Sequence, residues 1–93
     1  MFPRVLRQIR LKVRLHRYVM TLHAEEEMNE DRLSILDVEQ VVWRGKIIER
    51  QRDKVSGEWK YLVFGPTSEG EPAVVVGKLS VTGKFVIITV YRE

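Results

Sequence analysis

The spacing of apolar residues changes at Gly45, and this change limits the possible fold more than any other feature of the chain. Before Gly45, apolar residues such as Val5 and Ile9 recur every three or four positions, which is typical of one face of a helix. After Gly45 come short apolar runs such as 74–76 and 86–88, separated by segments rich in turn-forming residues. The sequence therefore predicts an α+β domain in which helices precede strands.

Three helices are expected in the first half, at about residues 3–15, 22–30 and 35–44. Pro3 suits a first helical turn, because the N–H that proline lacks has no partner there. Thr21 and Ser34 are expected N-caps, since a hydroxyl can accept a hydrogen bond from a free N–H of the first turn. Gly45 is expected to end the third helix.

Four strands are expected in the second half, at about residues 46–52, 59–64, 72–79 and 85–91. The loops between them are short, whereas parallel neighbours need a long crossover. We therefore expect a four-stranded antiparallel meander with the helices packed on one face. Residues 18–21 are also β-prone, and they fit either a short strand or an extended link.

Size and composition limit the classes of protein to consider. Ninety-three residues form one domain, 1–93, with one core and room for a shallow site. The chain has no cysteine, which excludes disulfides and thiolate metal sites. No apolar stretch approaches the roughly 20 residues that cross a bilayer, and arginines interrupt the start where a signal peptide needs apolar residues. We expect a cytoplasmic protein with no membrane partner.

Charge is unevenly distributed along the chain. Residues 1–17 contain six Lys or Arg and no acid, whereas residues 24–39 contain seven Asp or Glu and one Arg. A basic helix raises the local concentration of phosphate groups. Arg7, Arg10 and Arg14 are therefore candidate nucleic-acid-binding residues. The alternative is that they form an ordinary solvated helix face.

His16 and His23 are the only side chains whose ordinary pKa lies near neutrality. His23 begins an acidic helix, with Glu26 and Glu27 one turn later, and a carboxylate there can orient an imidazole as an acid or base. The alternative is a histidine that only caps or packs. Two histidines without cysteine make a poor ligand set, so we expect no metal; without a phosphate-binding glycine loop, we expect no cofactor.

Polar residues interrupt the apolar strands at Lys60, Lys78, Thr89 and Tyr91. By strict alternation Thr89 and Tyr91 share a face with Phe85 and Ile87, and Lys78 shares one with Val74 and Val76. On an open sheet face, such residues could supply cations for a phosphate and a proton donor, as phosphodiester cleavage requires. They are equally consistent with solvent-facing residues.

Several segments together resemble an uncharacterised bacterial and archaeal domain family, over nearly the whole chain. They are YVMTLHAEEEM at 18–28, LSILDVE at 33–39, GKIIER at 45–50, EWKYLVFG at 58–65 and ITVY at 88–91. Members of that family often resemble toxins of the RelE and MqsR type, encoded beside a small zinc-finger antitoxin of the MqsA (YgiT) type.

The resemblance implies a RelE-like fold and a metal-independent endoribonuclease that acts on messenger RNA. It implies that His23, Lys60, Lys78 and Tyr91 carry the reaction. Our own hypothesis adds that Glu26 or Glu27 orients His23. Many relatives have arginine four residues after the histidine and again near position 31, where this chain has Glu27 and Asp31. These replacements remove two cations from an RNA-binding surface.

We therefore expect a toxin-like endoribonuclease of a type II toxin–antitoxin pair, with RNA and a zinc-finger antitoxin as partners. The alternative is a non-catalytic module that binds nucleic acid or protein through its basic first helix. A third interpretation is that this amphipathic helix forms a homodimer.

Overall fold

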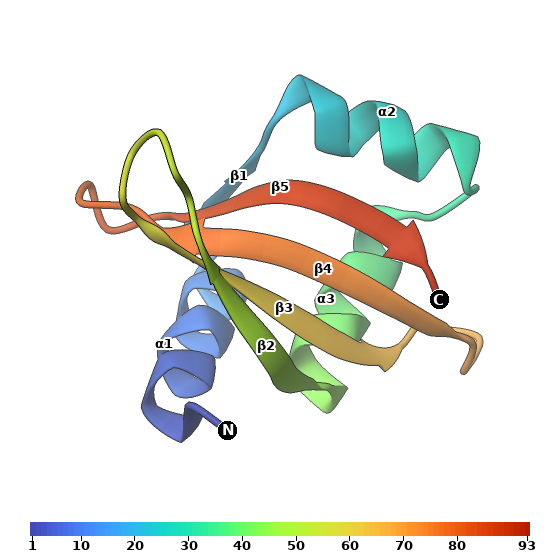
Figure 1. Cartoon of the computed structure of the whole chain (residues 1–93). Helices are drawn as coiled ribbons and strands as arrows, with labels where there is room; N and C mark the ends of the chain where they lie inside the picture. The colour runs from blue at the N-terminus through green and yellow to red at the C-terminus, as the bar shows by residue number, and fades with distance from the viewer.

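A computed structural model describes all 93 residues of the chain, and its helices precede its strands with one exception near the N-terminus (Figure 1). The elements are α1 (Pro3–Arg14), β1 (Tyr18–Met20), α2 (Leu22–Glu30), α3 (Ile35–Arg44), β2 (Lys46–Arg52), β3 (Trp59–Pro66), β4 (Pro72–Leu79) and β5 (Phe85–Arg92). The predicted α+β class and the boundary at Gly45 are confirmed. None of the helices is both long enough and apolar enough to cross a bilayer.

The sheet has five strands in the order β1-β5-β4-β3-β2, so the predicted four-stranded antiparallel sheet is wrong in one respect. Strands β2 to β5 form the expected antiparallel meander, but β1 adds a parallel neighbour to β5. The amide of Phe85 donates to Arg17 O, and that of Thr21 to Ile87 O, both at 3.0 Å. The parallel pair is feasible because the whole chain between Met20 and Phe85 serves as the crossover.

The predicted bounds of α2, α3, β2 and β4 are confirmed, while α1 ends one residue earlier than expected. The hydroxyl of Thr21 accepts a hydrogen bond from Ala24 N at 3.1 Å, which confirms this N-cap. Ser34 and Asp37 form a reciprocal capping box at the start of α3. Strands β3 and β5 run on to Pro66 and Arg92, because their pairing with β4 continues past the expected ends.

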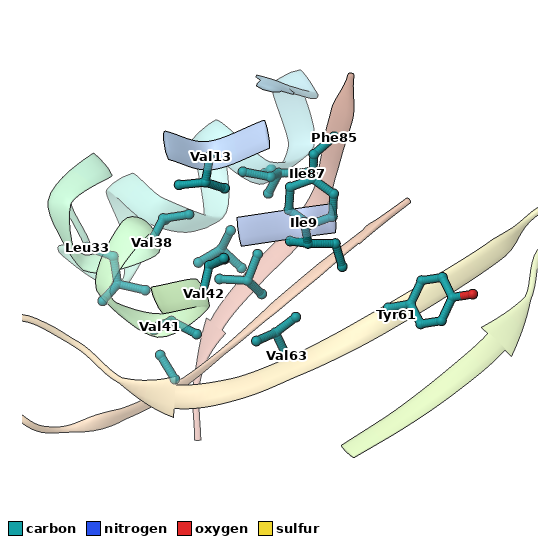
Figure 2. Packing of buried hydrophobic residues seen from close by; sticks show 14 of the residues in the cluster. Ile9, Val13, Leu33, Val38, Val41, Val42, Tyr61, Val63, Phe85 and Ile87 are labelled. Atoms are coloured by element: carbon teal, nitrogen blue, oxygen red, sulfur yellow. The ribbon is translucent and has the colours of Figure 1, made fainter. Parts of the chain in front are cut away.

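The main core lies between the sheet and the helices α1 and α3, and it also includes Ala24 and Met28 of α2, which runs along the outer edge of β5 (Figures 1 and 2). Ile9 of α1, Val42 of α3 and Phe85 of β5 are fully buried in it. At roughly 25 cal/mol per Å² of buried apolar surface, such side chains stabilise the fold by about 1.5–3 kcal/mol each. The opposite side of the sheet, which we call the open face, has a separate small cluster of Leu62, Val74 and Val76.

A β-bulge reverses the alternation of side chains in the second half of β5. Val76 pairs with Thr89 but Gly77 pairs with Ile87, so Ile88 is an extra residue on β5. Val90 is therefore buried in the core with Ile87, whereas Tyr91 packs on the open-face cluster. The expectation that Thr89 and Tyr91 share the face of Phe85 and Ile87 is wrong, because strict alternation takes no account of a bulge.

Candidate functional site

His23 lies in the first turn of α2 and contacts Glu27 one turn later. Its Nε2 atom is 3.3 Å from Glu27 Oε1, and its side chain is 65% exposed. The same carboxylate oxygen accepts a hydrogen bond from the Val90 amide of β5 at 3.1 Å. The carboxylate that orients His23 is therefore itself held by the sheet. The other ring nitrogen, Nδ1, makes no hydrogen bond within the protein and is free for a ligand.

Glu27 and Asp31, one helical turn apart, close the outer edge of β5. Strand β1 ends at Met20, so the later β5 amides have no strand beside them. Glu27 accepts from Val90 N, and Asp31 Oδ2 accepts from Arg92 N at 3.1 Å. An open strand edge leaves polar groups unpaired and invites association with other chains. Glu27 and Asp31 therefore have a structural role at the edge of the sheet.

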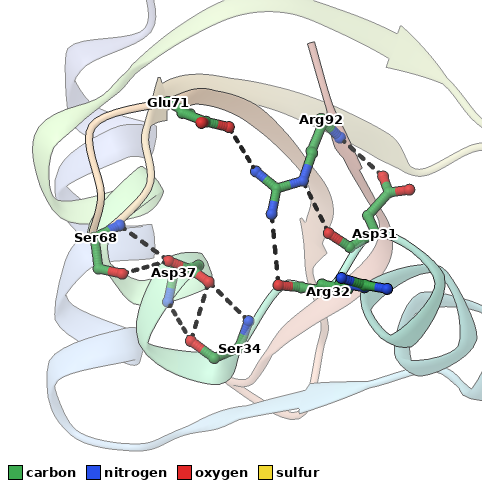
Figure 3. A network of polar contacts seen from close by, with 7 residues as sticks. All are labelled: Asp31, Arg32, Ser34, Asp37, Ser68, Glu71 and Arg92. Carbon is green, nitrogen blue, oxygen red and sulfur yellow. Dashed lines mark hydrogen bonds and ion pairs between the residues drawn. The ribbon is translucent and has the colours of Figure 1, made fainter.

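Arg92 ties the end of β5 to the end of α2 (Figure 3). Its Nε atom donates to Asp31 O at 2.8 Å, and another guanidinium nitrogen lies 3.0 Å from a carboxylate oxygen of Glu71. A cation beside free carbonyls at a helix C-terminus is favourable, because the helix dipole is negative there. Arg92 therefore helps to fix α2, and with it His23, on the edge of the sheet.

Tyr91 lies on the open face, where burial first, and then the charges of Glu93, Glu49 and Glu27, raise the pKa of its phenol. The phenol thus stays protonated at neutral pH, so it can donate a hydrogen bond or a proton but is a poor base. Glu27 contacts His23 directly, whereas its charge is only the last of the effects that raise the pKa of Tyr91, and no hydrogen bond joins Tyr91 to either residue.

Lys78 lies apart from Tyr91 and is already paired. Its Nζ atom donates to Glu58 Oε1 at 2.8 Å, and this bond lowers the pKa of Glu58. In the β4–β5 register Lys78 faces Val86, whereas Tyr91 faces Val74. Val74 and Lys78 are four residues apart on one strand, which corresponds to about 13 Å. The structure does not bring Lys78 and Tyr91 into one cluster.

Lys60 pairs with Gln51 in the β2–β3 register, near the hairpin that joins these strands. Hydrogen bonds from Ser56 and Val55 lower the pKa of Asp53 in that hairpin, and the charges of Lys60 and Lys78 lower it further. The two lysines thus belong to a mixed-charge cluster at one end of the sheet, while His23 and Glu27 lie along the later part of β5.

The basic face of α1 forms a third candidate site with an aromatic residue of α3. A shallow hollow of about 620 Å³ is lined by Arg4, Arg7, Gln8, Arg10, Leu11, Arg14 and Trp43. Trp43 is 51% exposed. Sequence reasoning missed it, although Val41 and Val42 occupy the inward face of α3 and thereby turn the next residue outward.

Arg10 differs from Arg7 and Arg14 in its contacts. Its guanidinium donates to Val42 O at 3.1 Å and to Gly45 O at 2.8 Å, so it caps the C-terminus of α3. Arg7 and Arg14 make no hydrogen bond or ion pair within the protein. Of the three arginines predicted to bind nucleic acid, Arg10 is therefore held by the fold and the other two are free.

No group of three or more His, Asp or Glu side chains lies in an arrangement that could hold a metal ion. No curated protein and no solved structure matches this chain. A family described as a domain of unknown function, DUF4258, matches residues 20–92, from the last residue of β1 to the end of β5. Helix α1 precedes the matched residues. Because the match covers most of its length, the chain belongs to the DUF4258 family.

Proposed function

We propose that the protein is a toxin-like, metal-independent endoribonuclease with a RelE-like fold, in which His23 is the acid–base group. The observation that carries this proposal is the arrangement of His23, Glu27 and the Val90 amide. An exposed imidazole is oriented by a carboxylate that is anchored in turn, and catalytic bases are commonly held in this way. A histidine that only packs against the fold would be expected to have a less exposed side chain than His23 has.

The reaction would use the 2′-hydroxyl of RNA as its nucleophile. His23 would accept the 2′-hydroxyl proton through Nδ1, and the 2′-oxygen would attack the adjacent phosphorus atom. The bond to the 5′-oxygen of the next nucleotide would break, leaving a cyclic phosphate, and Tyr91 would donate a proton to that oxygen. Tyr91 is protonated at neutral pH and could therefore be the donor, although its raised pKa makes it a weaker acid than an ordinary phenol.

Lys60 and Lys78 lie at the other end of the sheet from Tyr91, so in this proposal they would hold phosphates of neighbouring nucleotides and not the phosphate that is cleaved. Lys60 has no ion-pair partner, whereas Lys78 would have to exchange Glu58 for phosphate. As a toxin in the cytoplasm, the protein would need a neutralising partner, and we propose a zinc-finger antitoxin encoded beside it.

The test is expression of the chain with and without its neighbouring gene, followed by growth and RNA-integrity measurements. We expect growth arrest and RNA cleavage that persist in EDTA, and loss of both in His23→Ala. Glu26→Ala is the matched control, since it removes a neighbouring carboxylate that does not contact His23. If the wild type and His23→Ala leave RNA equally intact, the enzyme proposal is wrong.

A second candidate is a non-catalytic RNA-binding module that uses α1, and it is favoured by the unpaired Arg7 and Arg14 beside the hollow. Such a module would lose affinity steeply with salt and would be indifferent to His23→Ala. A homodimer through α1 would have to use this arginine face, because Ile9 and Val13 are already buried inside the chain. Light scattering at low and high salt tests that arrangement.

A further inference from the structure

We infer that the hollow between α1 and α3 is a docking site for single-stranded RNA, in which a base stacks on Trp43 and arginines of α1 contact the flanking phosphates. This inference rests on the proposal that the protein acts on RNA. It adds that the RNA is single-stranded and that Trp43 discriminates it from a duplex. We call the hollow with Trp43 the arginine–tryptophan site.

Trp43 is the largest apolar side chain that the hollow exposes. It is about half exposed, although an indole of this size is usually covered in a folded domain. A second hollow of about 320 Å³ also includes Arg14 and Trp43, together with His16. The indole is thus accessible from two adjoining hollows, as a stacking surface for a base needs to be.

The charge around Trp43 is positive and not neutralised within the chain. The three ion pairs of the protein involve His23, Lys78 and Arg92, and none lies on α1. Glu39 brings the single negative charge of the two hollows, against four arginines, and its carboxylate accepts the hydroxyl hydrogen bond of Tyr18 at 2.7 Å. Free guanidinium groups beside an exposed aromatic ring suit a phosphate backbone with splayed bases.

The arginine spacing also fits an extended strand. Arg7 and Arg14 are seven residues apart on one helix, or about 10.5 Å along its axis, so they would contact different phosphates. A hollow of about 620 Å³ lies within the range of about 300–1,000 Å³ that is usual for small ligands, and it can admit a nucleotide. A duplex keeps its bases stacked on each other, so only an unpaired base can stack on Trp43.

The chain provides a direct optical test, because it has only two tryptophans. Trp59 lies beneath the guanidinium groups of Arg50 and Arg52, at 3.9 and 4.4 Å from its ring. Trp59→Phe therefore leaves Trp43 as the only indole reporter. On titration with a single-stranded RNA oligonucleotide at low salt, we expect quenching of Trp43 fluorescence. The matching RNA duplex should cause none.

Affinity measurements by fluorescence anisotropy separate stacking from charge. We expect Trp43→Ala to weaken binding by about 5-fold to 100-fold, and Trp43→Phe to weaken it less, because base–aromatic stacking is sequence-tolerant. Replacing Arg7 and Arg14 with Gln should make the plot of log binding constant against log salt concentration less steep, by about 1.4 in slope. Lys54→Gln removes a charge from the β2–β3 hairpin and is the control.

The outcomes distinguish this inference from the proposed function. If the full chain binds no RNA of any form, the RNA-directed function itself is wrong. If single-stranded RNA binds without quenching Trp43, or binds Trp43→Ala as tightly as the wild type, the function survives and the inference is overturned. Equal affinity for the RNA duplex also overturns it. The quenching test uses native Trp43, so it holds even if Trp43→Ala does not fold.

Discussion

Arg10→Ala is expected to destabilise the protein far more than the same change at Arg7 or Arg14. The three arginines look equivalent in the sequence, since all lie on the basic face of α1. In the structure only Arg10 reaches α3, where it donates to Val42 O and Gly45 O at 3.1 and 2.8 Å. Its removal leaves two carbonyls at the end of α3 without their partner and removes a cation from the negative end of the helix dipole.

The magnitude follows from these two bonds. A hydrogen bond that involves a charged group contributes about 1.5–3 kcal/mol, and the lower end applies here because Arg10 is only partly buried. We expect Arg10→Ala to lower the free energy of unfolding by about 2–3 kcal/mol. For a domain of this size, 2 kcal/mol corresponds to a decrease in Tm of about 8–16 °C. Arg7→Ala and Arg14→Ala should stay within about 0.5 kcal/mol of the wild type.

Urea unfolding followed by circular dichroism measures all three variants under one condition. Arg10→Lys is a useful fourth variant, because an ammonium keeps the charge but cannot span both carbonyls as a guanidinium does. It should fall between the wild type and Arg10→Ala. If Arg10→Ala proves as stable as Arg7→Ala, the assignment of Arg10 to the cap of α3 is refuted, and Arg10 returns to the candidate RNA-binding residues.

Three further predictions concern the sheet and its polar contacts. Glu27→Ala should speed hydrogen exchange of the Val90 amide and lower the free energy of unfolding by about 1–2 kcal/mol more than Glu27→Gln, which keeps an acceptor. Equal exchange rates in the two variants would contradict the role of Glu27 at the edge of β5. Hydrogen bonds from Ser34 and Ser68 outweigh the opposing effect of burial and hold the pKa of Asp37 at about 2. Because this folded-state pKa lies below the ordinary value, the associated stability is present above about pH 4 and is lost toward pH 2; Ser68→Ala should make that loss shallower in acid titrations. Gly77→Ala would place a Cβ 2.5 Å from the buried Phe85 ring, so it should lower the free energy of unfolding by about 1–3 kcal/mol. An unchanged Tm would argue against that close contact.

Local signals predicted most of the secondary structure correctly. Thr21 and Ser34 act within one helical turn of themselves, so their capping contacts depend on little beyond the neighbouring backbone. The change of apolar spacing at Gly45 is likewise local, because period and element type are linked by backbone geometry. These features are confirmed in the structure almost residue by residue.

The candidate site was less predictable, because the same residue types serve structural and functional ends. The pairing of His23 with Glu27 follows from helical spacing and was anticipated. The anchoring of Glu27 on Val90 was not, since the two residues are 63 positions apart. Trp43 likewise lines a hollow only because α1 packs beside α3, which the sequence around Trp43 does not predict.

The amino-acid sequence alone determined the class of the fold, the element order after β1, the helix caps and the basic character of α1, because each depends on residues close together in the chain. Only the tertiary structure decided that β1 pairs with β5, that a bulge turns Tyr91 to the open face, and that Arg10 belongs to α3. The physical reason is that these outcomes depend on contacts between distant segments. Such contacts form where packing brings a distant residue to a backbone amide or carbonyl that lacks a hydrogen-bond partner, and no short stretch of sequence predicts them.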